Sequence, residues 1–187
     1  NDETKHAAIK KLPITVDPPV MGSEVTALGY PESKIQIFKN DSEMTHIMLN
    51  IKPTVSTGHV TEVHASYRDL AMMRFPCFTI DAKFTAGMSG GAIFNDKKEL
   101  CGLVCSSFQE DDSQGKSYYS NGVSIWPSMI IPLSLIQDDC VPDGLETGKT
   151  YKVFDLARCG YLDVRGYERI EFFKHENGTD GVRRKHY

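Results

Sequence analysis

The sequence predicts an all-β fold, an antiparallel barrel or sandwich, and three observations lead to this prediction. Turn-forming residues recur at short intervals, as at Asp17-Pro18-Pro19 and from Gly87 to Gly91. The runs between them are short and rich in β-branched and apolar residues. The chain is 40% hydrophobic and 25% charged, which is typical of a globular protein that buries a core. Short strands at this spacing indicate a barrel or sandwich rather than α/β layers.

Six runs are predicted as strands, and three further stretches are predicted as turns or loops. The strands are Val25 to Leu28, Ile35 to Phe38, Thr45 to Ile51, Val60 to Ala65, Ala92 to Phe94 and Leu100 to Ser106. Gly58 and Asn121-Gly122 are interpreted as turns, and Asp111 to Lys116 as a polar loop.

The chain changes character in its last third. Pro127 is expected to start a helix that runs to about Gln137, although Pro132 would strain its middle. After Cys140 the sequence predicts a linker, a short helix over Tyr151 to Ala157 and a strand over Tyr167 to Phe173. The polar tail from Lys174 to Tyr187 is predicted to be frayed. We therefore expect one domain over residues 1–139 and an extension of unknown role over residues 140–187.

Charge and composition exclude several classes of partner. A net charge of -4 gives no basic face for nucleic acid and no polybasic arm for a membrane. The longest apolar run, Met129 to Ile136, is too short to span a bilayer. The five cysteines lack a C-x-x-C pair, so no zinc site or other metal site is expected. Their odd number favours free thiols in a reducing compartment such as the cytoplasm.

The segment Gly87-Met88-Ser89-Gly90-Gly91 carries the clearest chemical signal. Glycines permit backbone angles that other residues reach only with strain, so a loop of this kind can turn its own amides toward one point. A nucleophilic serine needs such amides, because its attack on a carbonyl creates an oxyanion. The alternative is a glycine-rich hairpin with a solvated serine.

Five segments follow one another as motifs: Met21 to Pro31, Ser56 to Val60, Thr79 to Ala82, the loop around Ser89, and Leu100 to Ser106. In this order they resemble the second barrel of trypsin-like serine proteases, especially the bacterial HtrA-like ones. The resemblance covers about residues 7 to 138 and implies an antiparallel chymotrypsin-type barrel, followed by a short helix and a small C-terminal appendage.

The resemblance also implies roles for particular residues. Ser89 would be the nucleophile, and the amides of Gly87 and Ser89 would form the oxyanion hole. Lys83, six residues before Ser89, would lie at the base of the specificity pocket and favour an acidic side chain, unless it is a surface lysine. The wall of the substrate cleft would consist of Cys105, Ser106 and Ser107.

The family's catalytic histidine and aspartate, which come from its first barrel, have no counterpart in this sequence. The strand that should carry the aspartate resembles His6 to Leu12, with His6 at the aspartate position. We therefore keep two hypotheses. One is a serine endopeptidase that acts on proteins or peptides without a cofactor and is completed by a missing N-terminal barrel segment. The other is a pseudoprotease or protease fragment that binds peptides without cleaving them. A third alternative is an unrelated β-barrel with an incidental Ser-Gly-Gly loop.

Overall fold

The computed structural model describes residues 11–39, 45–112, 115–134 and 145–185. The chain divides into two compact units. Pro18–Ser124 form the first unit, and the residues up to Asp17 together with those from Ile125 onward form the second. The boundary predicted between residues 139 and 140 lies outside the described residues.

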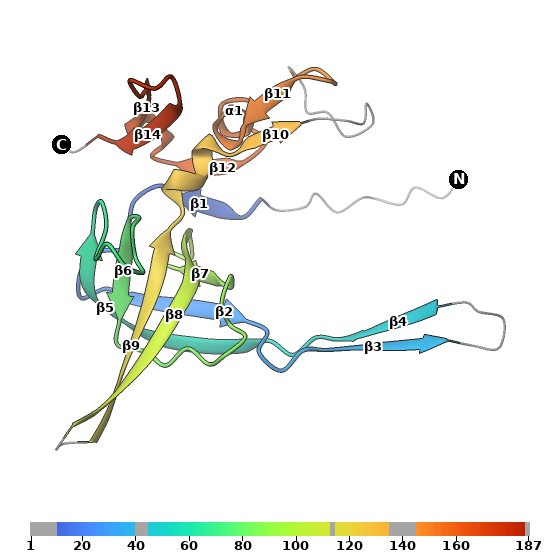
Figure 1. The fold of residues 1–187 in the computed structure, drawn as a ribbon, viewed down its shortest axis with the longest axis vertical. Helices are drawn as coiled ribbons and strands as arrows, with labels where there is room; N and C mark the ends of the chain where they lie inside the picture. The colour runs from blue at the N-terminus through green and yellow to red at the C-terminus, as the bar shows by residue number, and fades with distance from the viewer. Residues whose placement is uncertain (1–10, 40–44, 113–114, 135–144, 186–187) are drawn as a thin grey trace. The chain divides into compact units, whose positions relative to one another are not determined.

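Six antiparallel strands of the first unit close into a barrel (Figure 1). In spatial order they are β2 (Glu24–Gly29), β5 (Thr54–His64), β6 (Cys77–Ile80), β9 (Gly115–Ser124), β8 (Leu100–Asp112) and β7 (Ala92–Phe94), which pairs again with β2. A separate two-stranded hairpin consists of β3 (Lys34–Lys39) and β4 (Thr45–Asn50). The predicted all-β fold with an antiparallel barrel is thus confirmed.

The barrel core forms because alternate residues of its strands point inward. On β2, Val25 and Ala27 are buried, and they pack in one cluster with Phe78, Ile80 and Ile93. Phe78 is accommodated by glycines on neighbouring strands. A Cβ atom on Gly102 or Gly122 would lie 2.8 or 2.7 Å from atoms of its ring.

Three predictions for the barrel were wrong, and two of them concern β9. Asn121-Gly122 is not a turn but lies within β9, because Gly122 leaves room for Phe78 and the side chain of Asn121 is fully buried. The predicted loop from Asp111 to Lys116 is mostly strand, since β8 runs to Asp112 and β9 begins at Gly115. Gly58, also predicted as a turn, lies within β5.

The second unit consists of short strand pairs and turns around its own core. The pairs are β1 (Pro13–Thr15) with β12 (Asp163–Arg165), β10 (Pro132–Ser134) with β11 (Thr150–Lys152), and β13 (Ile170–Lys174) with β14 (Asp180–Arg184). The remaining elements are the 3₁₀ helices η1 (Trp126–Ile130) and η3 (Tyr167–Arg169) and the helix α1 (Val153–Arg158). Its core contains Val16, Trp126, Met129, Ala157, Val164 and Ile170.

Sequence reasoning located α1 but misjudged two neighbouring segments. The predicted helix from Pro127 is a single 3₁₀ turn, since Pro132 already belongs to β10. The tail is not frayed between residues 180 and 184, where β14 pairs with β13. Arg183 stabilises this hairpin by donating from Nε to the carboxylate of Glu171 at 2.9 Å.

Candidate active site

The loop that presents Ser89 depends on two glycines with left-handed backbone conformations. Gly87 has φ +91° and Gly90 has φ +82°, values that strain any residue with a Cβ atom. A Cβ atom at Gly87 would also lie 2.9 Å from the Cα atom of Pro31. The motif recognised in the sequence therefore has a structural requirement for glycine on both sides of Ser89.

Of the five backbone amides from Gly87 to Gly91, three donate to backbone carbonyls of described residues and two do not. Three are paired: Met88 donates to the carbonyl of Thr85 at 3.0 Å, Gly90 to Val104 at 2.8 Å and Gly91 to Met88 at 2.8 Å. Within the described part of the chain, the amides of Gly87 and Ser89 donate to no backbone carbonyl. These two donors, two positions apart in the chain, are free to bond to a bound group, and a negatively charged oxygen is the kind of acceptor that such amides favour.

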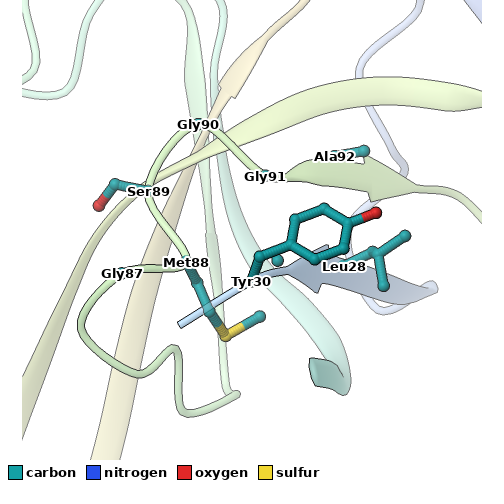
Figure 2. Close-up of a pocket in the computed structure, with 9 residues that line it drawn as sticks. Leu28, Tyr30, Gly87, Met88, Ser89, Gly90, Gly91 and Ala92 are labelled. Atoms are coloured by element: carbon teal, nitrogen blue, oxygen red, sulfur yellow. The ribbon is translucent and has the colours of Figure 1, made fainter. Parts of the chain in front are cut away.

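The hydroxyl of Ser89 is exposed and points away from Tyr30 and Leu28 (Figure 2). It donates a hydrogen bond of 3.2 Å to the carbonyl of Cys105. This carbonyl is free to accept because of a bulge in β8, where Val104 pairs with Gly122 and Ser106 with Asn121. Cys105 is the extra residue of the bulge, so the irregularity positions the group that holds Ser89.

Two cavities adjoin the loop, and Ser89 lines both of them. The first, of about 310 Å³, is lined by residues 28–30 and 87–92 (Figure 2). The second, of about 170 Å³, is lined by Phe84, Thr85, Ala86, Ser89, Val104, Ser106 and Ser107. We call the second one the serine cavity. A group bound at Ser89 therefore has space on two sides.

A buried polar network lies behind the serine cavity. The amide of Asn121 accepts from Arg68 Nη1 at 3.0 Å and from Thr79 Oγ1 at 3.3 Å, and its Nδ2 atom donates to Ser106 Oγ at 3.1 Å. Ser120 Oγ lies 2.5 Å from the carbonyl of Ala82, 2.9 Å from Ser107 Oγ and 3.1 Å from the amide of Phe84. Ser120 and Asn121 both have exposed fractions of 0%. This network fixes the side chains of Ser106 and Ser107, two residues that line the cavity.

Sequence reasoning missed Arg68, Ser120 and Asn121. The only signal was a pair of polar residues beside Gly122, and such a pair is more typical of a turn. Arg68 reaches Asn121 from a loop 53 residues away in sequence, so no local pattern reveals the contact.

Each histidine with a described side-chain contact interacts with a group other than Ser89. The Nδ1 atom of His59 is 3.7 Å from the carboxylate of Asp81, and Nε2 of His64 is 3.1 Å from that of Glu62. The ring of His175 lies against Phe173. No histidine is among the residues that line the two cavities in the described structure. His6 lies outside the described residues.

The residues predicted for the site are only partly brought together. Ser106 and Ser107 line the serine cavity, and Cys105 contacts Ser89 through its carbonyl. Lys83 is exposed and is not among the lining residues. Its ammonium lies 5.1 Å from the centroid of the Tyr118 ring, a cation–π contact.

The described residues also bear on metal binding, membrane insertion and disulfide formation. The part of the chain that the structure covers contains no group of three or more His, Cys, Asp or Glu residues arranged to hold a metal ion. Among these residues, no helix is long and apolar enough to cross a membrane. Four cysteines in this part, Cys77, Cys101, Cys105 and Cys159, are free thiols.

Comparison with known families agrees with the barrel and its serine loop. The trypsin-like peptidase domain family matches residues 4–103, which is more than half of the chain and includes Ser89. The chain therefore belongs to the trypsin-like peptidase domain family. No curated protein matches the sequence significantly.

Proposed function

We propose that this protein is a serine endopeptidase in which Ser89 attacks the peptide carbonyl and the amides of Gly87 and Ser89 stabilise the oxyanion. One observation carries the proposal: the exposed Ser89 hydroxyl lies between two cavities, in a loop whose only amides without a backbone acceptor in the described structure are those of Gly87 and Ser89. Membership of the peptidase family supports the same reaction.

The geometry suits acyl transfer for a physical reason. Attack by a hydroxyl on a carbonyl carbon moves negative charge onto the carbonyl oxygen, and preorganised amides stabilise this charge without reorganising. The loss of one such donor typically lowers the rate by about a hundredfold or more. The side chain before the scissile bond would enter the serine cavity, and the residues after it would lie along the first cavity.

None of the histidine side chains whose contacts are described lies against Ser89, so the general base is sought elsewhere. A serine hydroxyl is a weak nucleophile until a base removes its proton. In the described structure the hydroxyl of Ser89 bonds to the Cys105 carbonyl, and His59, His64 and His175 contact other groups. We propose that a histidine and an aspartate of the family's first barrel supply this function.

Labelling with a fluorophosphonate tests the proposal. On protein that includes the first-barrel histidine and aspartate, we expect one adduct per chain by intact mass for the wild type and for Ser33→Ala, which removes another exposed serine of the barrel unit. Ser89→Ala should give no adduct, because the probe reacts only with an activated serine. If folded wild-type protein is not labelled, the enzyme proposal fails.

The second candidate is a peptide-binding module. The observation in its favour is that Ser89 donates to the Cys105 carbonyl rather than to an imidazole. In this case peptides would bind at the serine cavity without being cleaved. Measurable binding of a peptide by protein that neither reacts with fluorophosphonate nor cleaves the peptide would establish this function.

A further inference from the structure

A loop of the barrel unit, residues 68–73, reaches the bulge of β8 at two points. We call it the arginine loop. Its Arg68 donates from Nη1 to the amide oxygen of Asn121, a residue of β9 that pairs beside the bulge, at 3.0 Å. At its other end, Sδ of the buried Met73 lies 3.8 Å from Sγ of Cys105, the extra residue of the bulge. The loop therefore supports the residue whose carbonyl accepts from the serine hydroxyl.

The arginine loop is held in shape by Asp69. One carboxylate oxygen of Asp69 accepts from the backbone amides of Ala71, Met72 and Met73, at 3.0, 2.7 and 3.3 Å. The other oxygen accepts from Nε of Arg68 at 3.1 Å. The backbone amide of Arg68 also donates to the carbonyl of Met73 at 3.0 Å. The guanidinium of Arg68 is therefore fixed before it meets β9.

Arg68 decides which end of the Asn121 amide faces β8. In the described structure the amide has three side-chain partners, and two of them are the hydroxyls of Thr79 and Ser106. A hydroxyl donates or accepts, so both would tolerate the amide in either orientation. A guanidinium only donates, so the oxygen of Asn121 must face Arg68. The nitrogen is then left to donate to Ser106 Oγ, at 3.1 Å.

The bond between Asn121 and Ser106 fixes the place of the bulge. Between its pairings with Gly122 and with Asn121, β8 contains one unpaired residue, Cys105. The side-chain bond joins Asn121 to Ser106, which form the first backbone pair after this residue. A shift of one residue would draw Cys105 into regular pairing with β9. Its carbonyl would then leave the position in which it accepts from Ser89.

We infer that Arg68 is a positioning residue for Ser89. It orients the amide of Asn121, and this amide holds Ser106 in register. The bulge then stays at Cys105, whose carbonyl accepts from Ser89. The order at the bulge follows from these contacts alone, whereas its effect on a reaction rate rests on the proposed function.

NMR of the full chain labelled with ¹³C and ¹⁵N tests the inference without catalysis. The ¹³C shift of the Cys105 carbonyl reports the bond from Ser89, so Ser89→Ala should move it upfield. Arg68→Met should remove most of this response to Ser89→Ala. Arg68→Lys should restore the response, because an ammonium is also a donor only. Arg74→Met is the matched control, since Arg74 is an exposed arginine that donates to the carbonyl of Leu70.

A second variant keeps the test independent of how well Arg68→Met folds. Ser106→Ala leaves the contact between Arg68 and Asn121 in place and should abolish the same carbonyl response. On protein that includes the first-barrel histidine and aspartate, Arg68→Met should lower kcat by about ten- to a hundredfold and leave KM nearly unchanged, because a displaced hydroxyl slows the chemical step.

The outcomes separate this inference from the proposed function. Loss of the carbonyl response in Arg68→Met, in protein that fluorophosphonate does not label, supports the inference and removes the enzyme. Labelling of Ser89 together with an unchanged response in Arg68→Met overturns the inference and leaves the enzyme intact. An equal loss in Arg74→Met, no recovery in Arg68→Lys, or an unchanged kcat in Arg68→Met would each overturn it as well.

Discussion

The barrel and the second unit use their polar side chains differently. In the barrel, Ser120 and Asn121 are fully buried and bond to Ser106 and Ser107 in the cavity wall. In the second unit, Asp17 holds the guanidinium groups of Arg169 and Arg184, which come from η3 and β14. The barrel is already closed by its strands, so its polar network is available to shape a site. The second unit consists of strand pairs that are marginal alone, so its charges serve to hold them together.

The largest predicted difference between the two units is in cysteine reactivity. Burial raises the pKa of Cys101 in the barrel to about 12, whereas Cys159 in the second unit is exposed. Because the thiolate is the reactive form, Cys101 should be modified roughly a thousandfold more slowly than an ordinary thiol. Iodoacetamide labelling followed by peptide mapping measures both rates in native protein. Comparable labelling rates at Cys101 and Cys159 would show that the barrel opens readily, and would contradict the expectation that its core keeps Cys101 buried.

A second test concerns the tight packing of the serine loop against the barrel. In Gly91→Ala the new Cβ atom would lie 2.3 Å from the Leu28 carbonyl oxygen and 2.8 Å from that of Met88. Backbone atoms cannot move aside easily, so we expect a loss of about 3 kcal/mol in the free energy of unfolding. Gly22→Ala is the control, since its φ is +83° but nothing lies within 4 Å, and it should lose about 1 kcal/mol. Urea denaturation would contradict the account if both variants lost the same amount.

The charge cluster of the second unit predicts a smaller and local effect. Asp17→Asn leaves Arg169 and Arg184 without a carboxylate, and both have a buried Nε atom that lacks a partner in the described structure. These side chains are about one-quarter to one-third exposed, so we expect a loss of about 1–2 kcal/mol. Hydrogen exchange should quicken at the β13–β14 amides and not at β2 or β7. Faster exchange in the barrel instead would show that the two units do not respond separately.

The smallest expected effect is a loss of folding stability in acid. The backbone amide of Met72, followed by the amide of Met73, the side chain of Arg68 and the amide of Ala71, lowers the pKa of Asp69 from 3.8 to about 2. A pKa lowered by folding adds stability above pH 4, and this contribution disappears as the pH falls from 4 toward 2. Asp69→Asn should therefore flatten the pH dependence of the urea midpoint in this window. An unchanged slope in the variant would assign the acid sensitivity to other carboxylates.

The fold was largely predictable where strands alternate in the usual way. Val25 and Ala27 on β2 and Ile93 on β7 mark the inward face plainly in the sequence. β9 could not be predicted, because its Asn121-Gly122 pair is suited locally to a turn and is held in a strand only by Phe78, Arg68 and Ser106. Tertiary contacts override local preference at this position.

The loop of the candidate site and part of its cavity wall, Ser106 and Ser107, were predictable, but the rest of the cavity was not. Glycine spacing around Ser89 identifies the loop because the left-handed φ angles at Gly87 and Gly90 require glycine. The position of Lys83 six residues earlier left two alternatives, a charged pocket base or a surface lysine, because spacing does not define where a long side chain points; Lys83 is exposed and lies over Tyr118. The hydroxyls of Ser106 and Ser107 became interpretable only once their partners on β9 were known.

The central claim is that Ser89 and two unpaired amides form one site for a tetrahedral oxyanion. Its most direct test is NMR of ¹⁵N-labelled protein with a peptide boronic acid, which forms a tetrahedral adduct with a reactive serine. The account predicts a tetrahedral ¹¹B signal and large downfield shifts of the Gly87 and Ser89 amide protons, with small shifts at Gly90 and Gly91, and none of these changes in Ser89→Ala. A trigonal boron signal, or equal shifts at all four amides, would contradict it.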